Sequence, residues 1–62
     1  MESKLNAFLD DGWEVTFHPY NHLRQTFLVS VKKTSPRYRD ICGEAKTPLE
    51  ALSNLYFGVF EN

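Results

Sequence analysis

The chain has 62 residues, of which 42% are hydrophobic, 15% are aromatic and 24% are charged. This composition is typical of a folded globular domain and excludes the disordered class. No stretch approaches the roughly 20 apolar residues that cross a bilayer, and the amino terminus lacks the basic and then apolar layout of a signal peptide. We therefore expect one compact domain over residues 1–62 that works in the cytoplasm, away from membranes.

Cysteine and histidine are too few to build a stabilising framework. The single cysteine, Cys42, excludes an internal disulfide and favours a reducing compartment. Together with His18 and His22 it gives a loosely spaced set without an evident fourth ligand, and two surface histidines near a turn are the simpler interpretation. We predict neither a metal site nor another cofactor.

The net charge of −1 conceals a strong segregation of charge along the chain. Residues 24–39 hold five basic side chains and no acid, whereas residues 1–23 and 40–62 each hold four acids and one lysine. A basic segment of this kind is compatible with a nucleic-acid site, an acidic protein partner, or a solvated strand pair that faces acidic helices. The last interpretation is favoured over nucleic acid, because nucleic-acid-binding domains are usually basic as a whole.

The first predicted element is a helix of about two turns from Ser3 to Asp11. Leu5, Phe8 and Leu9 recur there at helical spacing. Gly12 occupies the position of a glycine that ends a helix.

Three strands are expected next. Residues 13–18 and 27–32 alternate between apolar and polar side chains, which is the period of a strand with one buried face. Pro19-Tyr20-Asn21-His22 separates the two strands, and Thr34-Ser35-Pro36 turns the chain into a third strand from Tyr38 to Ala45. The facing of this third strand is open: Ile41 favours buried odd positions, whereas Tyr38 and Cys42 favour even ones.

A second helix closes the chain. Thr47 is a suitable N-cap, Pro48 fits the first helical position, and Glu50 completes a capping box. The side chains of the helix that recur on its buried face are Leu52, Leu55, Tyr56 and Val59.

These elements predict an α+β fold of order α-β-β-β-α, with two helices packed on one face of a three-stranded antiparallel sheet. The expected core consists of Leu5, Phe8, Leu9, Trp13, Val15, Phe17, Phe27, Val29, Val31, Leu52, Leu55 and Val59. The opposite sheet face is left to solvent or a partner, and its predicted side chains are Glu14, Thr16, His18, Leu28, Ser30 and Lys32.

Two resemblances follow from the motifs. Gly12-Trp13, a central strand and the ending Gly43-x-x-x-Thr47-Pro48-x-x-Ala51-Leu52-x-x-Leu55 resemble the small phage and prophage proteins described as ABA-sandwich domains. This resemblance spans most of the chain and implies a phage origin more than an activity.

The order of elements and the pattern Phe27-x-Val29-x-Val31 are similar to those of double-stranded RNA-binding domains. Those domains begin the last helix with a Lys-Lys-x-Ala-Lys run that lies on phosphates. Here Thr47-Pro48-Leu49-Glu50-Ala51 occupies that position, and a glutamate there repels the phosphate backbone.

Residue patterns supply no case for an enzyme. Asp10 and Asp11 are adjacent on a helix and do not face each other, so they are interpreted as a solvated helix end. Aromatic and basic side chains point instead to partner contacts, since Tyr and Arg are enriched in interface hot spots. The predicted partner-binding residues are Tyr20, His22, Arg24, Arg37, Tyr38, Arg39 and Phe57.

The residue patterns therefore predict a non-enzymatic module that binds another protein. The resemblance to small phage proteins implies that this partner is a host protein or defence complex, and that the chain is an inhibitor or adaptor of the anti-CRISPR kind. One alternative is a nucleic-acid-binding module that places Lys32, Lys33, Arg37, Arg39 and Lys46 on phosphates. Another is a homodimer that buries the open sheet face around Leu28.

Overall fold

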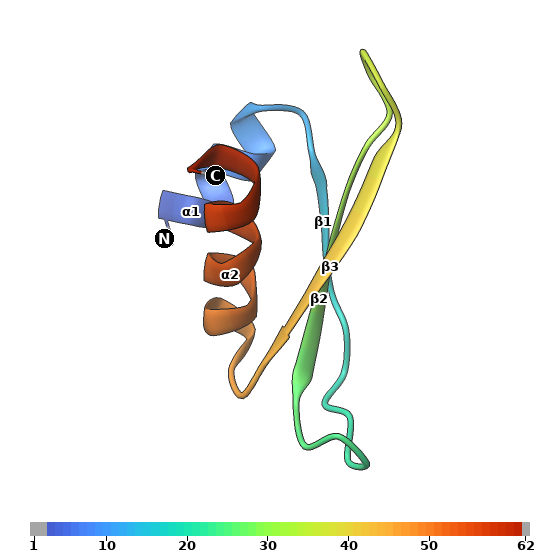
Figure 1. Cartoon of the computed structure of the whole chain (residues 1–62), viewed down its shortest axis with the longest axis vertical. Helices are drawn as coiled ribbons and strands as arrows, with labels where there is room; N and C mark the ends of the chain where they lie inside the picture. Colours follow the sequence, from blue (N-terminus) through green and yellow to red (C-terminus); the bar gives the residue numbers. More distant parts are fainter. Residues whose placement is uncertain (1–2, 62) are drawn as a thin grey trace.

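The chain folds as a helix, three strands and a second helix, and the computed structural model describes residues 3–61 (Figure 1). In chain order the elements are α1 (Ser3–Asp10), β1 (Glu14–Phe17), β2 (Phe27–Lys33), β3 (Arg39–Ala45) and α2 (Pro48–Phe60). The strands form one antiparallel sheet in the order β1-β2-β3. Both helices lie on the same face of this sheet (Figure 1), which confirms the predicted α+β architecture.

The strand register decides which face of β3 is buried. Val31 of β2 lies opposite Ile41 of β3, and directly opposed residues share a face of the sheet. Val29 and Val31 are fully buried and Ile41 is partly buried, whereas Tyr38 and Cys42 are exposed. Odd-numbered positions of β3 therefore face the helices.

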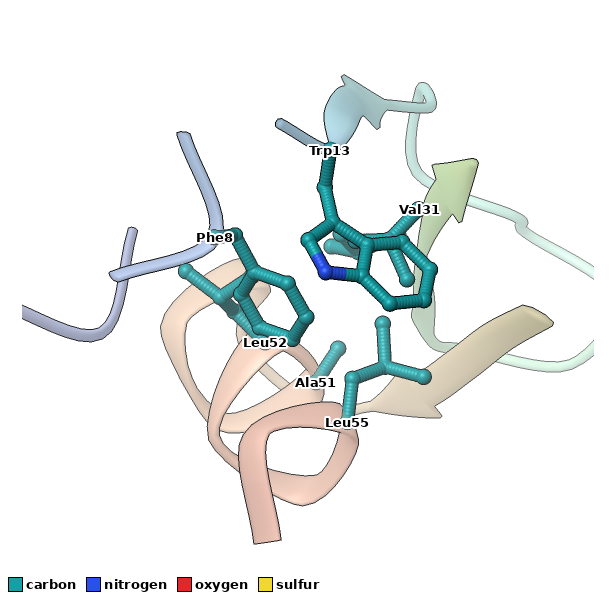
Figure 2. Close-up of a cluster of buried hydrophobic side chains, with 7 residues drawn as sticks. Phe8, Trp13, Val31, Ala51, Leu52 and Leu55 are labelled. Atoms are coloured by element: carbon teal, nitrogen blue, oxygen red, sulfur yellow. The ribbon is translucent and has the colours of Figure 1, made fainter. Parts of the chain in front are cut away.

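Seven side chains form the buried core, and they come from α1, β2, α2 and the residue just before β1 (Figure 2). They are Phe8, Trp13, Val29, Val31, Ala51, Leu52 and Leu55. Six of these belong to the predicted core. Ala51 was missed by the hydrophobic pattern, because a small side chain there is buried only through the close approach of α2 to β3.

Two core predictions are wrong. Leu9 is 50% exposed and Phe17 is 46% exposed. In α1 the inward position is taken by Phe8, and the next residue is turned by about 100° around the helix axis. Phe17 is the last residue of β1, whereas α1 lies beside the beginning of that strand and α2 packs on β2 and β3.

The junction between α1 and β1 is a Schellman motif. The N–H of Gly12 donates to the carbonyl of Leu9 at 3.1 Å, and the N–H of Trp13 donates to the carbonyl of Phe8 at 3.0 Å. Gly12 has φ of +89°, which an L side chain rarely adopts. The motif brings Trp13 back against Phe8, and their ring centroids are 5.8 Å apart in an edge-to-face arrangement.

The start of α2 agrees with the prediction. The side chain of Thr47 accepts a hydrogen bond from the N–H of Glu50 at 3.1 Å, and Pro48 occupies the first turn. This N-cap satisfies one of the amide groups that the first turn of a helix leaves without a partner.

Gly43 sets how closely α2 approaches the sheet. A Cβ atom at this position would lie 2.9 Å from the carbonyl oxygen of Ala51 and 2.9 Å from Cγ of Leu55. Neither neighbour is the free end of a flexible side chain, so a larger residue forces the helix away from β3.

We predict that Gly43→Ala lowers the free energy of unfolding by about 1–3 kcal/mol, because the added methyl group overpacks the contact between α2 and β3. Gly58→Ala is the matched control, since a Cβ there meets nothing within 4 Å; in the interior of a helix it should stabilise by about 0.5–1 kcal/mol. Urea unfolding followed by circular dichroism measures both. A Gly43→Ala variant as stable as the wild type would show that the contact is not tight.

A candidate binding groove at one end of the sheet

A groove of about 560 Å³ lies where the turn between β2 and β3 faces Trp13 and the last turn of α2. Its apolar lining comes from Pro36 of the turn and from Val59 and Phe60 of α2. Trp13, which is only 4% exposed, closes it toward the core. We call this site the Trp13 groove.

Cationic side chains lie over the indole ring of Trp13. The Nζ atom of Lys33 is 5.8 Å from the ring centroid and Cζ of Arg39 is 5.3 Å from it, both within cation–π range. Lys33 and Arg39 are directly opposed on β2 and β3, which places two like charges side by side.

Asp11 offsets part of this positive charge. Its Oδ2 accepts hydrogen bonds from Nε1 of Trp13 at 3.0 Å and from Nζ of Lys33 at 3.1 Å. The hydrogen bond from Lys33, and then the one from Trp13, holds the pKa of the Asp11 carboxyl below its ordinary value. Asp11 is exposed at the end of α1, as the sequence interpretation expects, and its carboxylate in addition ties the indole to β2.

Of the other basic side chains from residues 24–39, Arg24 also pairs with an acid through the fold, and Lys32 has acids opposite it in the strand register. Arg24 donates two hydrogen bonds to the carboxylate of Glu44, at 2.7 and 2.9 Å, and holds the pKa of Glu44 below its ordinary value. Lys32 lies between Glu14 and Asp40 in the strand register. Most of the basic side chains that are clustered along the sequence thus have acidic side chains near them in space.

Arg37 and Arg39 are the remaining basic side chains of residues 24–39. Both are exposed and both line the Trp13 groove. Within residues 3–61, neither has a carboxylate at ion-pair distance. The unbalanced positive charge of the basic segment is therefore concentrated at this groove.

The side chains of the Arg37-Tyr38-Arg39 run do not share one site in the structure. Tyr38 is 62% exposed, and its hydroxyl donates a hydrogen bond to Asp40 at 3.1 Å. The same bond raises the pKa of Tyr38, because removing the phenolic proton breaks it. The two arginines line the groove, whereas Tyr38 is engaged outside it.

The other predicted aromatic and basic cluster lies in the connection between β1 and β2, at the opposite end of the sheet (Figure 1). The Tyr20 ring packs at 4.9 Å from His22 and at 5.0 Å from Phe27. Arg24 is held by Glu44, as described above. The structure gives these side chains intramolecular contacts and does not bring them near the Trp13 groove.

Phe57 lies on α2 and outside the lining of the groove. It is 50% exposed, packs edge-to-face on Tyr56 at 5.9 Å, and has the Lys4 ammonium 5.8 Å from its ring centroid. The predicted partner-binding residues are consequently distributed over four places: the groove, the Tyr38 side chain outside it, the connection between β1 and β2, and α2.

The side chains predicted to bind phosphates are also dispersed. Lys33, Arg37 and Arg39 share the groove, whereas Lys32 faces the open side of the sheet and Lys46 lies in the connection from β3 to α2. No single surface of the described residues collects all five.

The open sheet face is polar at its centre. A shallow hollow of about 200 Å³ is lined by Glu14, Thr16, His18, Ser30, Lys32 and Asp40. Nε2 of His18 and Oγ of Ser30 are 2.7 Å apart, a contact that the sequence did not reveal because the residues are diagonal neighbours on paired strands. The pair links β1 to β2; within the described chain no carboxylate is hydrogen-bonded to the imidazole. Leu28, the centre of the predicted dimer face, is partly buried.

Comparisons with known proteins give no relatives. The chain matches no family model, no curated protein and no solved structure. Among residues 3–61, no three His, Cys, Asp or Glu side chains are grouped as metal ligands, and neither α1 nor α2 is long and apolar enough to cross a bilayer.

We predict that Asp11→Asn destabilises the protein at neutral pH and that the difference from the wild type shrinks as the pH falls from 6 to 3. Because the folded-state pKa of Asp11 is lowered, its carboxylate stabilises the fold above its ordinary pKa of about 4, and this contribution is lost as the pH falls through the folded pKa. Thermal unfolding across this pH range measures the effect.

Asp10→Asn is the matched control, since Asp10 is exposed on the same helix end and lies outside the groove lining. It should change the melting temperature less than Asp11→Asn at neutral pH. Equal effects of the two variants would contradict the assignment of Asp11 as the partner of Lys33 and Trp13.

Proposed function

We propose that this protein is a non-enzymatic protein-binding module that contacts its partner through the Trp13 groove. The observation that carries this proposal is the pair of arginines, Arg37 and Arg39, which lie beside an apolar wall and have no carboxylate at ion-pair distance within residues 3–61. Arginine and aromatic residues next to apolar surface are the groups that dominate the energetics of protein interfaces.

The architecture favours a partner-binding role for these residues. The floor of the groove is held by the core, because Trp13 is packed on Phe8 and its N–H is satisfied by Asp11. A site built on such fixed groups loses little conformational entropy when a partner binds. The arginines are exposed, so their guanidinium groups are accessible to the charges of that partner.

Nucleic acid is a weaker candidate for the same residues. Lys32 is flanked by acids on the open sheet face, and Lys46 lies at the far end of the sheet from the groove. A phosphate backbone is bound by basic groups that follow one continuous track. The net charge of −1 adds a repulsive background.

The partner that we propose is a host protein, with this chain acting as an inhibitor or adaptor of the anti-CRISPR kind. This identity is supported by the resemblance of the Gly12-Trp13 and Gly43 to Leu55 motifs to phage ABA-sandwich proteins. The groove supports protein binding independently of that resemblance.

Affinity capture from a nuclease-treated bacterial lysate tests the proposal. We expect the immobilised wild type to retain a specific protein. The Arg37→Glu/Arg39→Glu variant should retain at least tenfold less of that protein, because charge reversal at an interface places like charges together. The control, Lys32→Glu/Lys46→Glu, carries the same change in charge on other surfaces and should retain the protein.

Circular dichroism must show that all three proteins are folded. Equal capture by the Arg37→Glu/Arg39→Glu variant and the wild type would remove the groove from the interface. A protein that the wild type captures from an untreated lysate but not from the nuclease-treated lysate would instead favour the nucleic-acid alternative.

A further inference from the structure

We infer that the Trp13 groove binds an acidic peptide segment in which an apolar side chain lies beside one or two carboxylates. This inference rests on the proposed function and names the chemistry of the partner. Three features support it: the apolar wall, the positive charge of the groove, and the Trp13 indole, which is already in contact with Lys33, Arg39 and Asp11.

The apolar half of the groove accommodates a side chain. Val59 is partly buried and Phe60 is 38% exposed, so α2 presents accessible apolar surface there, and Pro36 faces it from the turn. A volume of about 560 Å³ is within the range of sites that enclose small ligands. The groove is therefore large enough for one apolar side chain and the backbone on either side of it.

The cationic side chains that line the groove favour carboxylates as ligands. Within residues 3–61, the acid that lines the groove with Lys33, Arg37 and Arg39 is Asp11, which is already bonded to Lys33. Among these described residues, the two guanidinium groups have no carboxylate at ion-pair distance. A guanidinium matches a carboxylate by two parallel hydrogen bonds, so Arg37 and Arg39 can hold two acidic side chains that flank an apolar one.

The indole of Trp13 is unsuited to stacking on a nucleic-acid base. It is 4% exposed, Lys33 and Arg39 lie over its ring, and its N–H is bonded to Asp11. Binding of single strands depends on accessible aromatic faces. These features favour a peptide over an oligonucleotide.

Trp13 is the only tryptophan of the chain, so its fluorescence reports on this groove alone. Arg39 lies 5.3 Å from the centre of its ring. A carboxylate that engages Arg39 changes the electric field on the indole and therefore its emission.

The experiment titrates the full chain with pools of short acetylated and amidated peptides that have Phe, Leu or Ile between two Asp or Glu residues. We expect saturable changes in Trp13 emission, with affinity at least tenfold higher than for matched pools that carry Asn and Gln. Replacing the central residue by Ala should weaken binding as well, because the apolar wall loses its contact.

Two variants locate the binding. The Arg37→Gln/Arg39→Gln variant should bind the acidic peptide pool with at least tenfold lower affinity, since charge-assisted hydrogen bonds to the carboxylates are lost. Lys32→Gln/Lys46→Gln removes the same charge elsewhere and should leave the affinity within twofold of the wild type. Equal affinity for acidic and amide pools, or equal losses in the two variants, would overturn the inference.

The outcomes separate this inference from the proposed function. If the peptides do not bind but lysate capture still depends on Arg37 and Arg39, the groove is an interface and the acidic peptide is the wrong ligand class. If an oligothymidylate binds at low salt with the same arginine dependence and the peptides do not, both the inference and the protein-binding role are overturned.

Discussion

Trp13 is the residue on which both the core and the groove depend. The Schellman motif at Gly12 turns the chain so that the indole packs on Phe8, and this contact joins α1 to the sheet. The same ring carries Lys33 and Arg39 near its face, while Asp11 accepts its N–H. A buried indole needs a partner for its N–H, and the acid that supplies it also binds a lysine of β2. Core packing and surface charge are therefore coupled through one side chain.

Charges that are segregated along the sequence are brought next to opposite charges by the fold. Along the chain, basic residues of the middle segment are separated from acids on both sides. In space, the meander brings Glu44 to Arg24 and Asp11 to Lys33, and places Lys32 between two acidic positions. Antiparallel strands juxtapose residues that are distant in sequence, so like-charged segments become opposite-charged neighbours. Within residues 3–61, the basic side chains of this segment that are left without a paired or register-opposed acid are Arg37 and Arg39.

This residual charge lies beside an apolar wall formed by the end of α2. Groups from four parts of the chain meet there: the α1–β1 junction, the end of β2, the turn with its following strand, and the last turn of α2. The negative end of the α2 dipole faces this region, which is favourable for nearby cations. A groove of mixed apolar and cationic character is consequently built from elements that the fold already needs for stability, and its floor is as rigid as the core.

The sequence by itself determined the order of elements, the cap of α2 at Thr47, the glycine that ends α1, and most of the core, because helical and strand periodicities and caps are local properties of the chain. It did not determine the facing of β3, the burial of Ala51 or the exposure of Leu9 and Phe17, since these depend on how far each helix extends over the sheet and how closely Gly43 lets α2 approach. Nor did it place Asp11 and Trp13 in a common site, or separate Arg37 and Arg39 from the basic residues that meet acids. Pairing between distant segments is decided by strand register and helix packing, and only the tertiary structure supplies both.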